Sequence, residues 1–282
     1  MQDPHTPAAA PDASPPLVLV ERLPLAHDGT WLGLITLNRP QQKNPIDWDT
    51  IRSLRSSLDQ LATDPAVRVV AFVGAGDAFS AGGDLKKYLR LQRDAAGFAG
   101  FLHDLHALFN FIQFDLPKPA VALINGVTAA GGLELALACD VVYACAGARI
   151  GDGHLNYGQM GGGGVLTRLP RQVLQNFGRE VMFTGCFLPP EPWLQAGLVN
   201  RIVDDRSALL RAAVGFADAV AVRSPLAVAN MKRVANRMRA QSFERALDEE
   251  ISTTRDYCLH SHDAQEGLLA FAQKRPPQYL GR

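Results

Sequence analysis

The stretch KPAVALINGVTAAGGLELALACDVVYA, residues 118–144, limits the folds open to this chain more than any other segment. Its two ends are short apolar runs rich in valine, which predict buried strands, and LELALACD between them predicts a buried helix. A strand, a helix and a second strand in immediate succession predict a βαβ unit with a right-handed crossover. The chain is therefore expected to have an α/β core.

The same alternation of strands and helices extends over most of the chain. Apolar runs predict strands at 17–23, 31–38 and 67–74, and helical periodicity predicts helices at 47–64 and 98–115. Beyond about residue 166 the pattern is mostly helical. We therefore divide the 282 residues into three parts: a disordered leader rich in proline and alanine (1–16), an α/β core (17–200) and a C-terminal helical region (201–282).

Composition excludes several classes of function. The 28 basic and 28 acidic residues balance to a formal charge of zero, which disfavours nucleic-acid binding. The four cysteines form no CxxC pair and predict reduced thiols rather than a disulfide framework or a metal site. The N-terminal residues lack the features of a secretory signal, and no apolar run reaches the roughly 20 residues that cross a bilayer. We expect a cytoplasmic protein without membrane or metal partners.

Two glycine-rich turns lie where a strand passes into a helix, one in AFSAGGDLKK (78–87) and one in NGVTAAGGLELALACD (125–140). Backbone N–H groups at a helix start have no partner within the helix and lie in positive potential. If the turns face each other, they can direct two N–H donors at one carbonyl oxygen, as in an oxyanion hole. Such turns also serve tight packing alone, and neither has the pattern of a nucleotide-binding loop.

Glu134 lies in the first turn of the helix that follows the second glycine turn. Its neighbours are Leu133, Leu135, Ala136 and Leu137, which indicate burial. A buried carboxylate is costly unless it is paired or functional, and burial raises its pKa toward values useful for acid–base chemistry. A surface carboxylate that interacts with the helix dipole is the alternative; we favour a functional Glu134.

The motifs together resemble the enoyl-CoA hydratase/isomerase (crotonase) superfamily, from about residue 17 to the end. The resemblance lies in ITLNRPQQKNPID, AFSAGGDLKK, the 118–144 stretch, GGGGVLTRLPR and FAQKRPP. It implies a spiral of ββα units, followed by a C-terminal helical trimerisation region that forms homotrimers or dimers of trimers. It also implies an acyl-CoA substrate, whose thioester carbonyl and enolate are held by the N–H groups of Gly83 and Gly131, and fatty-acid metabolism as the setting.

The resemblance also carries expectations for coenzyme A. By position, Lys43, Asn44, Ala81 and Lys86 are expected to contact the coenzyme A of the substrate. Lys274 resembles a position that reaches the ligand of a neighbouring subunit. Lysines suit phosphate groups as point charges, although Lys86 is equally compatible with a solvated helix surface. No cofactor is implied beyond the coenzyme A of the substrate itself.

The chain departs from the family pattern in ARIGDGHLNYGQMGGGG (148–164). Hydratases of the family typically place a second glutamate twenty residues after the first, and here that position is His154. An imidazole can accept or donate a proton near neutral pH, so Glu134 and His154 are expected to form an acid–base pair. Asp152 either orients this imidazole, which the i, i+2 spacing permits, or caps a turn.

Several reactions stay open on these residues. Hydration of an enoyl-CoA is the leading hypothesis. Hydrolysis of a thioester or of a C–C bond of β-diketone type, and decarboxylation, are alternatives on the same fold, while the missing carboxylate disfavours simple isomerases. A catalytically silent acyl-CoA-binding subunit is a remote alternative, which the retained Glu134 and both glycines disfavour. One helix supplies residues that either shape the acyl pocket or belong to the core: Phe98, Phe101, Leu102 and Leu105.

Overall fold

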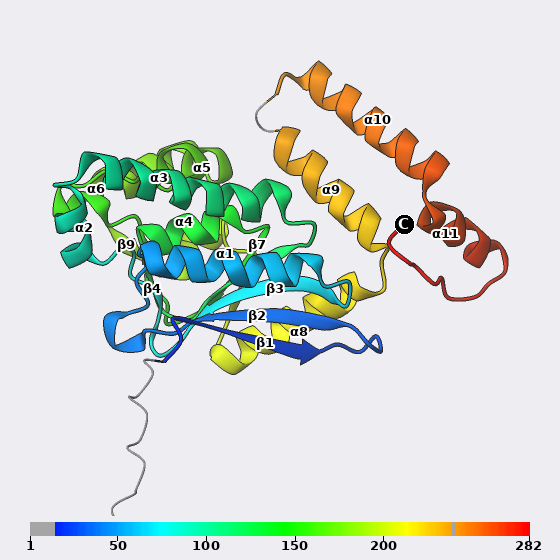
Figure 1. Ribbon diagram of the computed structural model, residues 1–282, viewed down its shortest axis with the longest axis horizontal. Helices are drawn as coiled ribbons and strands as arrows, with labels where there is room; N and C mark the ends of the chain where they lie inside the picture. Colours follow the sequence, from blue (N-terminus) through cyan, green and yellow to red (C-terminus); the bar gives the residue numbers. More distant parts are fainter. Residues whose placement is uncertain (1–14, 239–240) are drawn as a thin grey trace, which may run out of the picture.

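A computed structural model describes residues 15–238 and 241–282 of the chain. The expected leader, 1–16, lies almost wholly outside these residues. Figure 1 shows a mixed α/β body with helices on both sides of a sheet, and a helical arm that projects from one end. The expected α/β class is confirmed.

A six-stranded sheet forms the centre of the body, with the strand order β1-β2-β3-β5-β7-β10. β1 and β2 form an antiparallel hairpin, and all other neighbours are parallel. Alternate residues of its central strands contact different layers: Val70 and Phe72 face one apolar cluster, whereas Val69 and Ala71 face another. Its strands are β1 (Val18–Pro24), β2 (Trp31–Leu37), β3 (Val67–Gly74), β5 (Ala120–Ile124), β7 (Val141–Cys145) and β10 (Arg201–Val203).

A second, four-stranded sheet lies beside the first, in the order β4-β6-β8-β9. Its members have only two or three residues each: β4 (Ala78–Ser80), β6 (Val127–Ala129), β8 (Ile150–Gly151) and β9 (Phe187–Leu188). β4, β6 and β8 each follow a strand of the large sheet, and a helix comes after each pair of strands. The chain thus repeats the expected ββα order.

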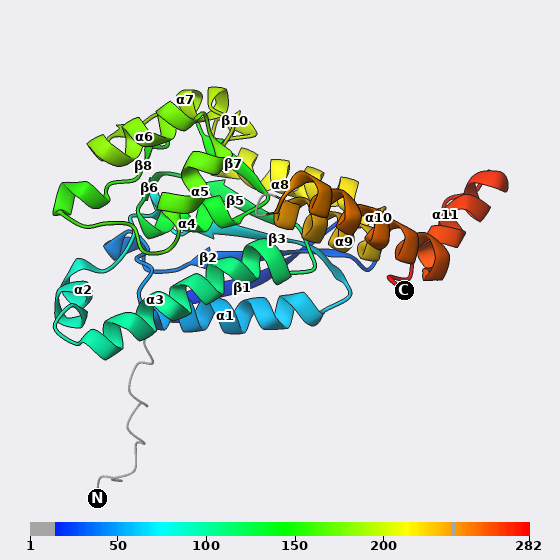
Figure 2. The ribbon, with the colours of Figure 1, turned by 90° about the horizontal axis from the view of Figure 1, so that it is seen from above.

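Helices cover both faces of the large sheet (Figures 1 and 2). α8 packs on one face through Leu209, Ala213 and Ala217. α1, α3 and α4 cover the other. The helices and helical turns of the body are η1 (Pro40–Gln42), α1 (Trp48–Thr63), α2 (Leu85–Leu91), α3 (Ala95–Asn110), the π-helical turn η2 (Phe111–Asp115), α4 (Gly131–Ala138), η3 (His154–Tyr157), α5 (Val165–Gln172), α6 (Gln175–Thr184), α7 (Pro190–Gln195) and α8 (Arg206–Ala221).

The C-terminal arm consists of α9 (Pro225–Arg237), α10 (Phe243–His260) and α11 (His262–Ala272). The buried Lys232 fixes the first helix of the arm to the body: it lies 2.7 Å from Asp140 and donates to the carbonyls of Ile112 and Lys118. The boundary at residue 200 remains a prediction, and the region after it is not wholly separate, because β10 and α8 pack with the large sheet.

No single helix among the described residues has both the length and the apolar character that crossing a membrane requires. One bent pair, Arg206–Ala221 with Pro225–Arg237, passes by length and composition, with 110° between its two helices.

Candidate active site

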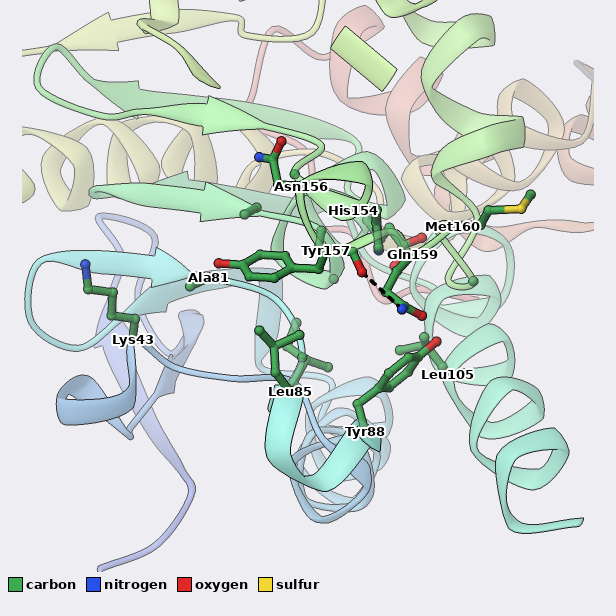
Figure 3. A pocket seen from close by; sticks show the side chains of 18 of the residues that line it. Lys43, Ala81, Leu85, Tyr88, Leu105, His154, Asn156, Tyr157, Gln159 and Met160 are labelled. Atoms are coloured by element: carbon green, nitrogen blue, oxygen red, sulfur yellow. Dashed lines mark hydrogen bonds between the residues drawn. The ribbon is translucent and has the colours of Figure 1, made fainter. Parts of the chain in front are cut away.

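A cavity of about 400 Å³ opens between the two glycine turns, α2, α3 and the segment around η3 (Figure 3). Its wall is mainly apolar. The lining residues are Lys43, Ile46, Ala81, Gly83, Leu85, Tyr88, Phe101, Leu102, Leu105, Val127, Ala129, Ala130, Gly131, Glu134, Gly153, His154, Asn156, Tyr157, Gln159, Met160, Gly162 and Phe187. The structure therefore brings both glycine turns together with Glu134 and His154.

The first glycine turn follows β4. The N–H of Ile46 donates to the carbonyl of Gly82 at 2.8 Å. Because a trans peptide places its C=O and N–H on opposite sides, the N–H of Gly83 points away from Ile46. A Cβ added to Gly83 would meet nothing within 4 Å, so this residue borders open space in the cavity.

The second turn precedes α4 and contacts the first. A Cβ on Gly82 would stand 2.7 Å from that of Ala130 and 3.4 Å from the nitrogen of Gly131, so only glycine permits this approach. Ala130 has φ 47° and ψ −117°, an uncommon conformation for a residue with a side chain. Within the described chain, neither Gly83 nor Gly131 donates its N–H to a protein acceptor.

Close packing holds α4 against the second sheet. A Cβ on Gly132 would stand 2.3 Å from the carbonyl oxygen of Ser80, and real Cβ atoms do not approach that closely. The helix start therefore lies directly on β4. This contact fixes the position of Glu134, two residues further along.

Glu134 is only 1 % exposed, as its apolar neighbours predicted. Its Oε1 accepts hydrogen bonds from the N–H of Gly163 at 2.7 Å and from the N–H of Val165 at 3.1 Å. A Cβ on Gly163 would stand 2.4 Å from Oε2, so this glycine is required for the approach. Burial raises the pKa of Glu134, although nearby His154 and the two N–H groups act to lower it.

His154 begins η3, and its ring Nδ1 lies 2.8 Å from Oδ1 of Asp152. Gly153 between them has φ 67°, a left-handed conformation that suits glycine. Burial acts to lower the pKa of His154, but the hydrogen bond with Asp152 and the charge of Glu134 outweigh it, so this pKa is raised. Since Nδ1 contacts Asp152, Nε2 is the ring nitrogen left for other partners.

The Asp152 side chain is buried and, in the described part of the chain, its one hydrogen-bond partner is the imidazole. This geometry favours the orienting alternative over a turn cap. A second contact joins this segment to the glycine turn, because the N–H of Ala130 donates to the carbonyl of Asp152 at 2.8 Å.

Glu134 and His154 lie near each other at the cavity. A Cβ on Gly161 would stand 3.2 Å from Cε1 of His154 and 3.3 Å from Oε1 of Glu134, but only 2.1 Å from Cγ1 of Val165, so no further atom fits at that point. Both side chains also line the cavity, where they lie near enough for one small molecule to contact both. The four glycines at 161–164 bring the chain against Glu134.

Sequence reasoning missed Arg168, which supports the segment that binds Glu134. Its guanidinium is 8 % exposed and donates from Nη1 to the carbonyl of Gly163 at 2.8 Å. Two further donations reach side chains of η2 and α3, Gln113 at 2.8 Å and Asn110 at 2.6 Å. Arg168 shares the buried face of α5 with Val165 and Leu169. That spacing alone is no clear sign of a buried arginine, because arginine is mostly exposed in proteins.

The residues expected to contact coenzyme A are not all at the cavity. Lys43 and Ala81 line it, and the N–H of Ala81 donates to the carbonyl of Lys43 at 2.9 Å. Lys86, in the first turn of α2, does not line it. Lys274 follows α11, at the end of the molecule opposite to α2 (Figures 1 and 2).

Asn44 also lies outside the cavity, and its side chain is 1 % exposed. The amide nitrogen donates at 2.8 Å to the carbonyls of Ala75 and Ala78, and its oxygen accepts from the N–H of Arg39 at 2.9 Å. These bonds tie the loop before α1 to the start of β4. Asn44 thus shapes the loop that presents Lys43.

Most of the residues that the sequence predicted for an acyl pocket line the cavity. Phe101, Leu102 and Leu105 line the cavity. Phe98 does not line it, and packs instead against Tyr88, with the ring centroids 5.4 Å apart.

The fold and the cavity agree with the sequence comparison, in which the pattern of the enoyl-CoA hydratase/isomerase family matches residues 29–282. The chain belongs to this family. It is similar to a carnitinyl-CoA dehydratase of Proteus mirabilis, with 35% identity over 267 residues that cover 93% of this chain and 99% of that protein. A crotonyl-CoA hydratase of Syntrophomonas wolfei is 29% identical over 252 residues, which cover 89% of this chain and 95% of that one.

A solved structure of a related enzyme has the same fold. The crystal structure of an enoyl-CoA hydratase from Bacillus anthracis superimposes with a TM-score of 0.86 at 28% identity, over 95% of this chain and 100% of that one. The expected crotonase-like fold is thereby confirmed. The protein is an enzyme of this superfamily, and its relatives are named hydratases and dehydratases.

Proposed function

We propose that this enzyme adds water to the double bond of an enoyl-CoA, or removes it in the reverse direction. The thioester oxygen accepts hydrogen bonds from the N–H groups of Gly83 and Gly131, which stabilise the negative charge of the enolate. Two features support this assignment: both N–H groups are without protein acceptors in the described chain, and both residues line the cavity.

Glu134 and His154 act as the acid–base pair. The Glu134 carboxylate takes a proton from water as the water oxygen bonds to the β-carbon of the acyl group. The α-carbon of the enolate then receives a proton from Nε2 of the imidazolium, while Asp152 stabilises the imidazolium through Nδ1. Proton exchange with solvent restores Glu134 to its anion and His154 to its cation, which closes the cycle.

The presence of Glu134 and His154 side by side in the wall of one cavity with both glycine turns carries this proposal. A single water in the cavity beside the two side chains can contact both groups. The relatives favour the same chemistry, because their names describe hydration of crotonyl-CoA and dehydration of carnitinyl-CoA.

The remaining contacts follow from position. Lys43 and Ala81, at the mouth of the cavity, are proposed to hold coenzyme A, with Lys86 nearby. No cofactor is needed beyond the coenzyme A of the substrate.

A homotrimer is also proposed, in which Lys274 reaches the nucleotide of a neighbouring subunit. The arm supports this assembly because it carries exposed apolar side chains, including Phe243 (71 %), Ile251 (63 %), Leu268 (75 %) and Phe271 (84 %).

Turnover of crotonyl-CoA tests the proposal through loss of the absorbance of its conjugated double bond, with dehydration of carnitinyl-CoA measured in parallel. We expect Glu134→Gln and His154→Ala each to lower kcat by about 100-fold or more, the usual contribution of a general acid or base. His103→Ala is the control, because that side chain is 81 % exposed. Normal turnover by Glu134→Gln would overturn the site assignment, and release of free coenzyme A thiol in place of hydration would show a hydrolase.

A further inference from the structure

Tyr88, on α2, contributes a polar hydroxyl to an otherwise apolar part of the cavity wall. Its neighbours in the lining include Leu85, Leu102 and Leu105. Figure 3 shows its ring reaching into the cavity from α2, on the side opposite to His154. A substrate held between these two sides contacts the tyrosine.

Packing fixes the ring of Tyr88. Phe98 and Phe101 meet it edge-on, with centroids 5.4 and 6.1 Å away and interplanar angles of 74° and 78°. The preceding residue, Lys87, ties α2 to the start of α1 through Asp47 at 2.7 Å. A ring held in this way places its hydroxyl at a defined position in the cavity.

The hydroxyl has no protein hydrogen-bond partner in the described part of the chain, and it is not fully buried, so it is open to a ligand in the cavity. Burial and the charge of Glu134 both raise the pKa of Tyr88, so the group stays a neutral donor. The same carboxylate disfavours a second anion beside the hydroxyl. A partner from the substrate is therefore best uncharged.

From this geometry we infer that Tyr88 selects short enoyl-CoA substrates that carry an uncharged oxygen, a hydroxyl or carbonyl, beyond the double bond. The substrate oxygen accepts a hydrogen bond from Tyr88 Oη, while the thioester lies at the glycine turns. This inference rests on the proposed function and adds the class of acyl group.

Binding of saturated acyl-CoA molecules tests the inference without any turnover. Calorimetry compares butanoyl-CoA with 4-hydroxybutanoyl-CoA on the wild type and on Tyr88→Phe, with Tyr257→Phe on α10 as the matched control. Loss of one hydrogen bond in an enclosed site predicts a change of about 5- to 10-fold in the ratio of the two Kd values. We expect that change in Tyr88→Phe, against the hydroxylated ligand, and none in Tyr257→Phe.

An unchanged ratio in Tyr88→Phe would overturn the inference. Turnover of crotonyl-CoA and 4-hydroxybut-2-enoyl-CoA separates this failure from failure of the proposed function. Hydration of both compounds with equal effects of Tyr88→Phe removes the selectivity and leaves the hydratase assignment standing. If the wild type hydrates neither compound, the proposed function fails, whatever the binding ratio shows.

Discussion

Substitution of Asp152 by asparagine tests whether the contact with His154 governs proton transfer. The two side chains are 3 % and 14 % exposed and their polar atoms lie 2.8 Å apart, so solvent screens the interaction little. A hydrogen bond to a charged group contributes about 1.5–3 kcal/mol. Its loss therefore weakens the preference of His154 for the proton by roughly 10- to 100-fold.

The direction in which Asp152→Asn shifts the pH profile follows from the effect of Asp152 on the pKa of His154. Because Asp152 raises the pKa of His154, the wild-type imidazole stays protonated to higher pH, and activity that needs the imidazolium falls only above that pKa. In Asp152→Asn, the basic limb of kcat/KM moves to lower pH. Asp152 also acts to raise the pKa of Glu134, so the acidic limb moves slightly in the same direction.

Profiles of kcat/KM for crotonyl-CoA between about pH 5 and 9 measure both limbs. An NMR titration of the imidazole signals, assigned with His154→Gln, gives a readout independent of activity. Asp104→Asn is the matched control, because Asp104 lies 3.3 Å from His103 on the surface and keeps an acceptor for Trp48 as asparagine. A basic limb and an imidazole titration that stay in place in Asp152→Asn would refute the reasoning.

Three further predictions address stability. Burial raises the pKa of Glu134 above its unfolded value, so the contribution of this group to stability is greatest below the unfolded pKa and is lost as pH rises through the folded pKa. Glu134→Gln should therefore raise Tm in calorimetric scans, and the increase should be larger at neutral than at mildly acidic pH. Lys232→Met removes the cation beside the partly exposed carboxylate of Asp140 and two donations to backbone carbonyls, and should cost about 1–3 kcal/mol in urea denaturation. Arg255→Ala breaks an exposed pair and should cost about 0–1 kcal/mol. Gly132→Ala places a methyl group against a backbone carbonyl and should cost about 1–3 kcal/mol of unfolding free energy. In Gly83→Ala the added methyl group meets open space, so this variant should keep the wild-type Tm. Equal losses of stability in these two variants would contradict the packing described for α4.

The parts of the fold with long apolar runs were predictable from sequence. The strand at 120–124, α4 and β7 follow one another as the apolar pattern indicated, since each buries enough apolar side chains to leave a signal. The second sheet left none, because β8 and β9 have two residues each and a period of two needs more positions to be recognised. The resemblance to the superfamily, rather than periodicity, supplied the ββα order.

The candidate site was likewise only partly predictable from sequence. Burial of Glu134 was predictable from its neighbours, whereas its donors, Gly163 and Val165, come from a segment about thirty positions further along that no local rule connects to it. Arg168 looked like an ordinary helix arginine until the fold placed it against Gly163. Asn44 shows the converse, because an amide that closes a loop has the same sequence signature as one that binds a ligand.

The two glycine turns touch through backbone atoms and a methyl group, with no ionisable side chain between Gly82 and Ala130. A spacing set by repulsive contact responds to neither proton concentration nor ionic strength, whereas the nearby pair of Glu134 and His154 responds to both. On the proposed mechanism, the group that polarises the carbonyl and the groups that move protons are therefore independent parts. On that mechanism, a substitution at His154 can change the reaction while the N–H groups of the two glycine turns still polarise the thioester carbonyl.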